Sequence, residues 1–286
     1  MHQLISRHGF DAGIAAKPAA RIRVAAVIPA YNEVRTLRAV VSSVLDEVDL
    51  VIVVDDGSTD GTPEQIRDLP VRLIRHEKNL GKSYSLADGF HAALTAGAEV
   101  VVTLDGDGQH RPQDIPVLLA EHGRYPVSLI IGSRLHEKEN IPPARYRANR
   151  FANFWIAWAA GYPICDSQSG FRVYPADLLK ALLPLIEKRP GFVLESQILI
   201  LAGWRNIQGR AVPIPAIYPA TCRPSHFRPV RDITLITLMV ARHLLMRGLH
   251  WQGLIASLRR SGPSRSERQP VFGISESGGS PLQRRE

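Results

Sequence analysis

Short, continuous apolar runs alternate with helical segments along the first half of this 286-residue chain, and that alternation limits its fold more than any other feature. A strand that is apolar on both faces needs cover on both faces, which is typical of a parallel sheet between helices. We therefore predict an α/β fold. The expected strands are Val24–Ile28, Leu50–Val54, Val71–Ile74, Glu99–Leu104 and Val127–Ile131, and the expected helices 33–47, 63–68, 83–96 and one from about Pro112.

The second half is predicted to be mainly helical, with one more strand. We expect helices over 143–160, 175–187 and 193–202 and a strand over Gly209–Ile214. The expected organisation is a flexible leader over 1–21, a main domain over 22–228, an amphipathic basic helical segment over 229–260 and a disordered tail over 261–286. The tail is rich in Ser, Gly, Arg and Pro, a composition that cannot form a core.

Polar motifs follow three of the predicted strands. They are Pro29–Glu33, Asp55–Thr62 and Asp105–Gln109. In open α/β sheets, ligands bind in the crevice outside the carboxyl ends of the strands. The three loops are therefore expected to line one cleft.

The third of these loops places two carboxylates, Asp105 and Asp107, around a glycine at the end of a strand. Gly106 lets the backbone turn, so both carboxylates can point into one cleft. Hard oxygen ligands of this kind suit Mg²⁺ or Mn²⁺. The alternative is a polar turn that only ends the strand. An EF-hand calcium loop is excluded because its glycine and glutamate positions hold His110 and Pro116.

The loop Asp55–Thr62 also follows a strand and precedes a helix. Its carboxylates could accept hydrogen bonds from a base or from ribose hydroxyls, or Asp60 or Thr62 could cap the helix. Gly81-Lys82-Ser83 resembles the end of a Walker A loop, but His76 stands where that motif needs a glycine. Lys82 can still serve as a cation for phosphate. A dinucleotide-binding glycine motif is absent after the first strand.

The net charge of +8 is concentrated near the C-terminus, where residues 223–260 hold seven arginines and one acid, Asp232. Arginines at helical spacing with leucines and Trp251 indicate an interfacial helix on an anionic membrane surface. The alternatives are packing on the chain's own domain or contact between copies of the chain. Nucleic acid is not expected, because no base-reading motif accompanies the charge. No run reaches the ~20 apolar residues of a spanning helix.

The ends and the cysteines point to the inside of the cell. The N-terminus through Arg23 lacks the apolar run of about 7–15 residues that a signal peptide needs. Cys165 and Cys222 have no metal-ligand spacing and suit incidental intracellular thiols. We expect a cytoplasmic protein, peripherally attached to the inner face of the membrane.

The ordered motifs together resemble the family 2 glycosyltransferases. They are Pro29–Glu33, Asp55–Ser58, Asn79–Lys82, Asp105–Gln109, Gly132–Arg134, Asn149–Arg150 and Asp166–Arg172, and the resemblance covers about residues 23–230. The last run, with Glu195, is similar to the branch that contains dolichol-phosphate mannose synthase and other polyprenyl-phosphate glycosyltransferases. The resemblance implies the GT-A fold, a doubly wound, mostly parallel sheet that binds a nucleotide-sugar.

The resemblance also implies roles for individual residues. Asp105 and Asp107 would face the metal and the diphosphate, with Gln109 as a third ligand of Mg²⁺ or Mn²⁺, and Arg134 would neutralise phosphate. Asp166 would lie near the transferred sugar and would be the base for a hydroxyl acceptor. The nucleotide-sugar set is completed by Pro29, Tyr31, Glu33, Asp56 and Lys82, and the acceptor set is Arg150, Ser169, Arg172, Glu195, Arg223, Ser225 and Arg228.

The expected function is metal-dependent transfer of a hexose from an NDP-sugar to a lipid acceptor, polyprenyl phosphate first. A phosphate acceptor is already an anionic nucleophile and needs no strong base, whereas a hydroxyl of another lipid or of a soluble acceptor would need one. Two other classes stay open. One is a nucleotidyltransferase, which usually carries a glycine- and lysine-rich loop after its first strand. The other is a non-catalytic nucleotide-sugar-binding protein.

Overall fold

A seven-stranded sheet forms the centre of the chain, in the order β3-β2-β1-β4-β6-β5-β7. The computed structural model describes residues 23–137, 139, 141–186, 191, 193–215, 217 and 229–258. All neighbouring strands are parallel except β6, which runs antiparallel to β4 and β5. The strands are β1 Val24–Ala30, β2 Leu50–Asp55, β3 Arg72–Arg75, β4 Val100–Thr103, β5 Leu129–Ser133, β6 Arg172–Pro175 and β7 Gly209–Pro213. The mostly parallel sheet is as predicted.

The two faces of the sheet build two separate apolar cores, which explains why its strands are apolar throughout. Along β1, Ala25 and Val27 belong to one core, and Ala26 and Ile28 to the other. Helices α2, α4, α5 and α6 cover the first face, and α1 and α3 the second. Their bounds are α1 Leu37–Leu45, α2 Lys82–Thr95, α3 Ile115–Arg124, α4 Pro143–Ala160, α5 Ala176–Leu182 and α6 Leu194–Trp204. Short 3-10 helices include η1 Pro63–Ile66, η2 Pro112–Asp114 and η4 Leu183–Leu185.

Strand β6 is the main departure from the sequence prediction, which had no strand there and a helix over 175–187. The chain instead forms β6 up to Pro175 and only then the helix α5, which is followed by η4. In the sheet, Val173 faces Val102 of β4 and Ile130 of β5. This four-residue strand is short, and its pairing with β4 and β5 on both sides stabilises it. Helix α1 also begins later than expected, because the backbone N–H groups of Thr36 and Leu37 bond to the carbonyl of Glu33 in a turn.

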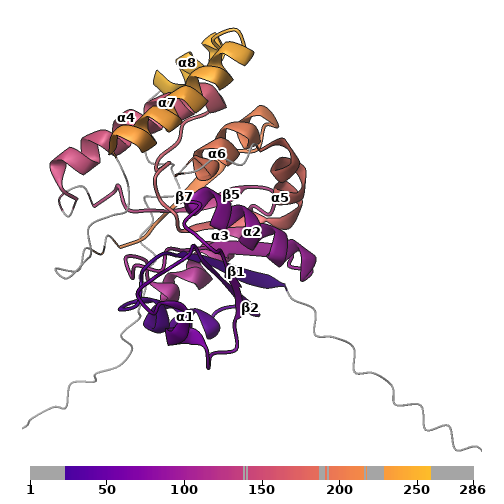
Figure 1. Cartoon of the computed structure of the whole chain (residues 1–286). Helices are drawn as coiled ribbons and strands as arrows, with labels where there is room; N and C mark the ends of the chain where they lie inside the picture. The colour runs from indigo at the N-terminus through magenta and orange to yellow at the C-terminus, as the bar shows by residue number, and fades with distance from the viewer. Residues whose placement is uncertain are drawn as a thin grey trace, which may run out of the picture.

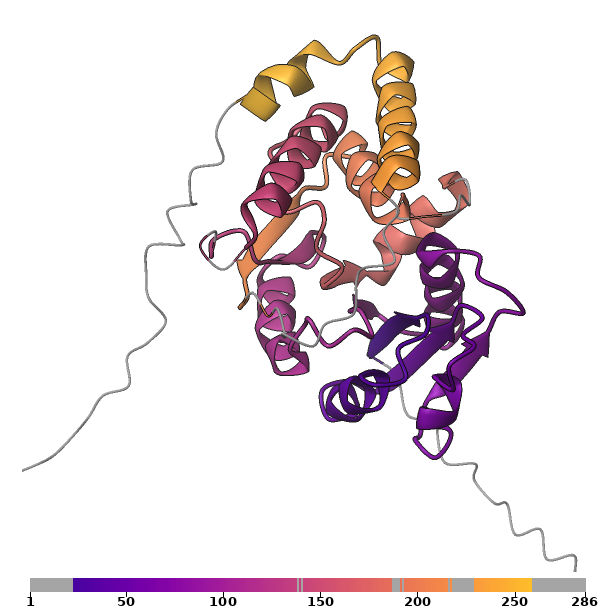
Figure 2. The same ribbon diagram turned by 60° about the vertical axis from the view of Figure 1, so that its left-hand side comes forward.

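Two helices follow the last strand and form the C-terminal helical extension that the sequence predicted. They are α7 Pro229–Met246 and α8 Trp251–Leu258, and they lie beside α4 at the end of the molecule opposite α1 (Figures 1 and 2). Met239, Val240 and Leu244 of α7 are buried in the core that α4 and α6 share. Trp158 of α4 donates its indole N–H to the carbonyl of Leu249, just before α8, at 2.9 Å. In the part of the chain that the structure describes, no helix has the length and hydropathy to cross a bilayer.

Candidate active site

The three polar motifs meet at one edge of the sheet, because β1, β2 and β4 are parallel and end there. Ala30 is level with Asp55 across the β1–β2 pair. Strand β5 runs the same way and brings Ser133 and Arg134 to this edge. The predicted convergence is therefore present in the structure.

Side-chain hydrogen bonds join the loop after β1 to the loop after β2. Asn32 donates its backbone N–H to the hydroxyl of Ser58 at 2.7 Å, and its side-chain oxygen accepts the N–H of Thr59 at 2.8 Å. Glu33 donates its backbone N–H to the hydroxyl of Thr62, also at 2.7 Å. Asn32 has a left-handed backbone, φ 56°, a conformation that asparagine tolerates. Pro29, Tyr31 and Glu33 are half-buried along this joined rim, consistent with their expected place in a nucleoside pocket.

The carboxylate of Asp56 is bonded within the chain. It accepts the backbone N–H groups of Leu80 and Gly81 at 2.9 and 2.8 Å, and its Oδ1 lies 2.7 Å from Nδ1 of His76. The second ring nitrogen of His76 lies 3.2 Å from Asp88 of α2. Asp56 thus fixes the loop that leads into Lys82, a positioning role that sequence reasoning did not assign. The helix-cap alternative named Asp60 or Thr62. Thr62 is the N-cap of η1 but makes no side-chain capping bond, and the carboxylate of Asp60 accepts the backbone N–H of Thr62 itself at 3.0 Å.

Three charged side chains form a chain of contacts beneath this edge. Nζ of Lys82 lies 2.6 Å from Oδ1 of Asp105 and 3.2 Å from Oε1 of Glu195. Burial opposes ionisation of Asp105, but the Lys82 ammonium outweighs it and lowers the pKa of this carboxyl to about 2. Burial likewise opposes the charge on Lys82, yet Asp105 and Glu195 together raise its pKa above the ordinary value. Asp105 and Lys82 are therefore both charged near neutral pH.

The pKa of Asp107, two residues further along the same loop, is shifted in the opposite direction from that of Asp105. Burial first, and then the charge of Asp105, raise its pKa above the ordinary value. Its Oδ1 accepts the backbone N–H of Gln109 at 2.9 Å. A carboxylate that is partly buried beside a like charge is stabilised by a cation, so the donor set suits Mg²⁺ or Mn²⁺.

The described residues do not, however, supply a complete metal site by themselves. Among them, no three His, Cys, Asp or Glu side chains are grouped so that they could hold a metal ion. Asp105, Asp107 and the amide of Gln109 therefore need oxygen ligands from elsewhere. Mg²⁺ sites of this type commonly take them from substrate phosphate and water. The expected metal ligands thus fit a cation that arrives together with a diphosphate.

Asp166 is buried and ties two parts of the site together. Its carboxylate accepts the backbone N–H groups of Arg134, Gln168 and Ser169, each at 3.2 Å. Burial raises its pKa, and the nearby charge of Arg134 acts in the other direction. The charge of Arg134 also favours the ionised forms of Asp105 and Asp107, although the pKa of Asp107 remains raised overall, so this guanidinium acts on all three acids. Arg134 therefore places positive charge close to all three acids at this edge of the sheet.

The two residues Ser169 and Arg172, expected to contact the acceptor, are fully buried instead. Arg172 donates to the carbonyls of Ser169, Glu195 and Ser167 at 2.7, 2.8 and 2.8 Å. With its guanidinium bonded to three carbonyls, the buried Arg172 holds the turn that follows Asp166 in place. This replaces the acceptor contact that we expected for it. Arg150 is exposed on α4, and Arg223, Ser225 and Arg228 lie outside the described residues.

Sequence reasoning missed several residues that shape the site. His110 is buried against Phe171, with ring centroids 5.3 Å apart, and its Nδ1 accepts the backbone N–H of Asp105 at 3.3 Å. Asn153 of α4 bonds to both the N–H and the hydroxyl of Ser167, at 2.8 and 2.7 Å. His110 directly follows the carboxylate motif, which was a usable signal. Asn153 offered none, because its partner comes fourteen residues later.

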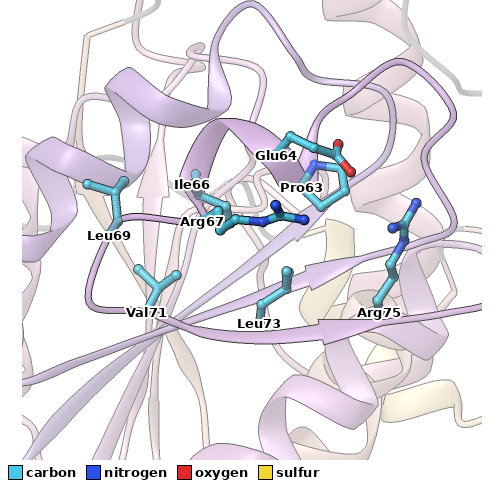
Figure 3. Close-up of a pocket in the computed structure, with 8 residues that line it drawn as sticks. All are labelled: Pro63, Glu64, Ile66, Arg67, Leu69, Val71, Leu73 and Arg75. Carbon is cyan, nitrogen blue, oxygen red and sulfur yellow. The ribbon is translucent and has the colours of Figure 1, made fainter.

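A surface pocket lies beside this edge, between η1 and the outermost strand β3 (Figure 3). Arg75 links it to the site, since its Nε lies 3.1 Å from Oδ2 of Asp55 and its terminal nitrogen donates to the carbonyl of Ser58. None of the predicted site residues lines it. Its lining residues are Pro63, Glu64, Ile66, Arg67, Leu69, Val71, Leu73 and Arg75.

Comparison with known proteins decides the family. The family model for glycosyl transferase family 2 matches residues 25–194, which include every motif from β1 to the start of α6. The chain belongs to glycosyltransferase family 2. This confirms the resemblance inferred from the ordered motifs, and the match ends just before Glu195.

Relatives of this family-2 chain include enzymes named for lipid-phosphate acceptors. It is 31% identical over 213 residues to a UDP-N-acetylglucosamine–dolichyl-phosphate N-acetylglucosaminyltransferase of Methanococcus voltae, covering 67% of this chain and 84% of that protein. It is also 31% identical over 179 residues to an undecaprenyl-phosphate mannosyltransferase of Micrococcus luteus, covering 59% of this chain and 73% of the other.

Solved structures support the fold. The crystal structure of glucosyl-3-phosphoglycerate synthase from Mycobacterium tuberculosis, in complex with Mn²⁺, UDP and glucosyl-3-phosphoglycerate, matches with a TM-score of 0.57. That match covers 79% of this chain and 80% of the other at 21% sequence identity. The mostly parallel sheet with helices on both faces is the GT-A fold, here with a C-terminal helical extension.

Proposed function

We propose that this family-2 glycosyltransferase moves a hexose from an NDP-sugar to polyprenyl phosphate at a membrane surface, with Mg²⁺ or Mn²⁺. The observation that carries the proposal is the meeting of Asp105, Asp107 and Arg134 at one edge of a GT-A sheet. The names of two relatives, a dolichyl-phosphate and an undecaprenyl-phosphate transferase, support the acceptor class.

The chemistry follows from charge. The diphosphate that leaves the anomeric carbon gains negative charge as the bond breaks, and fixed positive charge lowers that barrier. Arg134 supplies part of it. A divalent cation held by Asp105, Asp107 and Gln109 would supply the rest. A phosphate acceptor is already an anionic nucleophile, so no residue needs to take a proton from it. The buried Asp166, whose carboxylate accepts three backbone N–H groups, would then position the turn that follows it.

The helices at the far end of the molecule support a lipid acceptor. We call the apolar residues of α4, α7 and α8 that are more than half exposed the terminal apolar surface. Its members are Phe151, Ile233, Leu238, Leu245, Met246, Trp251, Ile255 and Leu258. Leu238, Arg242 and Leu245 recur at helical spacing on α7, and all three are exposed. Arg145, Arg147 and Arg150 are exposed on α4. Aromatic and aliphatic side chains with nearby arginines are the composition of an interfacial helix layer on anionic lipid.

The test is transfer of label from a panel of radiolabelled NDP-sugars to polyprenyl phosphate in detergent, with a chelator series. We expect label in the organic phase and release of nucleoside diphosphate. Release of pyrophosphate would instead indicate nucleotidyl transfer. Binding without turnover, for every sugar and acceptor offered, would leave a non-catalytic nucleotide-sugar-binding protein.

A hydroxyl acceptor is the second candidate, favoured by the burial that raises the pKa of Asp166, because a carboxylate with a raised pKa is a stronger base. Under that mechanism, Asp166→Asn would abolish transfer to a hydroxyl acceptor. The rate of the wild type would depend on pH through the ionisation of Asp166. Transfer to polyprenyl phosphate that survives Asp166→Asn supports the first candidate.

A further inference from the structure

Lys82 forms an ion pair with the carboxylate of Asp105, which the proposed function needs as a metal ligand. Its Nζ is 2.6 Å from Oδ1 of Asp105, and only 16% of the Lys82 side chain is exposed. An ammonium and a divalent cation on one carboxylate repel each other strongly, since partial burial weakens the screening by water. The two cations therefore compete for Asp105.

The surroundings fix where Lys82 can lie. It begins α2, and Glu195 stands in the first turn of α6. The hydroxyl of Ser83 joins the two helix starts, because it accepts the backbone N–H groups of Val193 and Leu194, each at 3.2 Å, and donates to the carbonyl of Gly191 at 2.8 Å. Lys82 can therefore keep its contact with Glu195 when its contact with Asp105 is lost.

Gly170 lies directly against the Lys82–Asp105 ion pair. A Cβ at Gly170 would lie 2.8 Å from both Nζ of Lys82 and Oδ2 of Asp105, inside any real contact distance. Only glycine lets the turn after Asp166 approach the ion pair this closely. The pair is thus set into its site by three separate segments of the chain.

We propose that Lys82 is a resident counter-ion of the donor site. It holds Asp105 in the ligand-free chain, leaves that oxygen when a divalent cation enters, and then pairs with Glu195 and the diphosphate of the donor. This rests on the proposed function. The metal should accordingly bind weakly to the nucleotide-free chain and much more tightly once nucleotide gives the displaced ammonium a new partner.

Mn²⁺ binding followed by electron paramagnetic resonance tests the exchange without any turnover. Wild type, Lys82→Met and Lys78→Met are titrated with Mn²⁺, alone and with UDP or GDP; Lys78 is an exposed lysine on the same loop. We expect Lys82→Met to raise Mn²⁺ affinity of the nucleotide-free chain roughly tenfold or more. It should also reduce the factor by which nucleotide tightens Mn²⁺ binding, since the two effects are linked. Equal Mn²⁺ affinity in wild type and Lys82→Met overturns the proposal.

Two further measurements do not depend on how well that variant folds. Gly170→Ala should separate the ion pair and raise Mn²⁺ affinity in the same direction, whereas Gly123→Ala, with open space around its Cβ, should not. In the wild type, amine acetylation measured by mass spectrometry should label Lys82 faster with saturating Mn²⁺ than without it, and adding nucleotide should reverse the gain. Labelling of Lys82 that ignores Mn²⁺ contradicts the exchange.

The outcomes separate the two proposals. A chain that shows the expected Mn²⁺ and nucleotide coupling but transfers no sugar keeps the counter-ion role and loses the proposed function. A chain that transfers sugar while Lys82→Met leaves Mn²⁺ affinity unchanged keeps the function and loses the counter-ion role.

Discussion

At the scale of single residues, Asp105 and Asp107 have opposite electrostatic settings although one glycine separates them. Lys82 stabilises the charge of Asp105, whereas burial and Asp105 itself destabilise the charge of Asp107. An ionised Asp107 therefore costs the ligand-free chain free energy that a bound cation would recover. Such a cost indicates a functional residue more than a structural one.

We predict that Asp107→Asn lowers turnover roughly a hundredfold or more, the scale seen when one stabilising group is removed from a charged transition state. The substitution removes charge while keeping volume, so the thermal midpoint should stay the same or rise. Steady-state kinetics and calorimetry measure the two quantities. Asp114→Asn, on η2 outside the site, is the matched control. Full activity of Asp107→Asn in chelator would remove Asp107 from the metal site.

His110 makes stability depend on pH. Burial lowers its pKa to about 3, from an ordinary value of 6.5. Between these values the unfolded chain binds a proton that the folded chain excludes, so stability falls as the pH falls through this range. We predict that His110 contributes a slope of up to about 1.4 kcal/mol per pH unit. Urea unfolding in chelator should show a smaller slope for His110→Phe than for wild type or for His91→Phe, an exposed control; equal slopes would assign the dependence elsewhere.

Sequence could place the catalytic candidates but not their partners. Asp56, Asp105 and Arg134 lie within two residues of a strand end, and strand ends can be predicted from a local pattern. The contact between Lys82 and Glu195 joins residues more than a hundred positions apart. Two charged residues at that separation carry no mutual signal in one sequence. Arg172 shows the same limit, because only the folded turn reveals that three carbonyls occupy its guanidinium.

At the scale of elements, the start of α6 depends on a cap from another helix. Ser83 of α2 accepts two backbone N–H groups there. We predict that Ser83→Ala lowers the free energy of unfolding by about 1–2 kcal/mol, the usual cost of a lost cap. Ser85→Ala is the control, since Ser85 is equally buried and its hydroxyl has no partner among the described residues. Chemical unfolding that gives equal losses for both variants would contradict the cap.

The elements that sequence predicted well are those with long periodic patterns. The strands before Asp55 and Asp105 and the helix α4 fell within a few residues of their predicted bounds. Strand β6 was missed because its four residues end in Pro175 and follow the Asp166 turn directly, so no repeat could form. Its identity as a strand comes from β4 and β5, which pair with it on both sides.

At the scale of the whole molecule, helix α4 joins the sheet edge that carries Asp105 and Arg134 to the terminal apolar surface. Helix α4 contacts both parts: Asn153 bonds to Ser167 beside Asp166, and Trp158 bonds to the carbonyl before α8. Inward-facing Met239, Val240 and Leu244 fix α7 to the core. The sequence analysis treated the apolar residues of 229–260 as one set, in which these three residues were not distinguished from Leu238 and Leu245. The structure divides the set, and only the outward half remains available to a membrane.

That outward half should bind anionic vesicles in two separable ways. Arginines near an anionic surface contribute up to about 1 kcal/mol each, and salt screens that attraction. The exposed side chains of Leu245, Trp251 and Ile255 would be buried in the lipid, and salt does not weaken that part of the binding. We predict that vesicle sedimentation of the full chain weakens at high salt without vanishing, and that Leu245→Asp with Ile255→Asp removes the salt-resistant part. Val117→Asp, on the exposed side of α3, should leave binding unchanged. If the wild type ignores anionic vesicles even at low salt, the terminal apolar surface has another use, and a soluble acceptor becomes the better hypothesis.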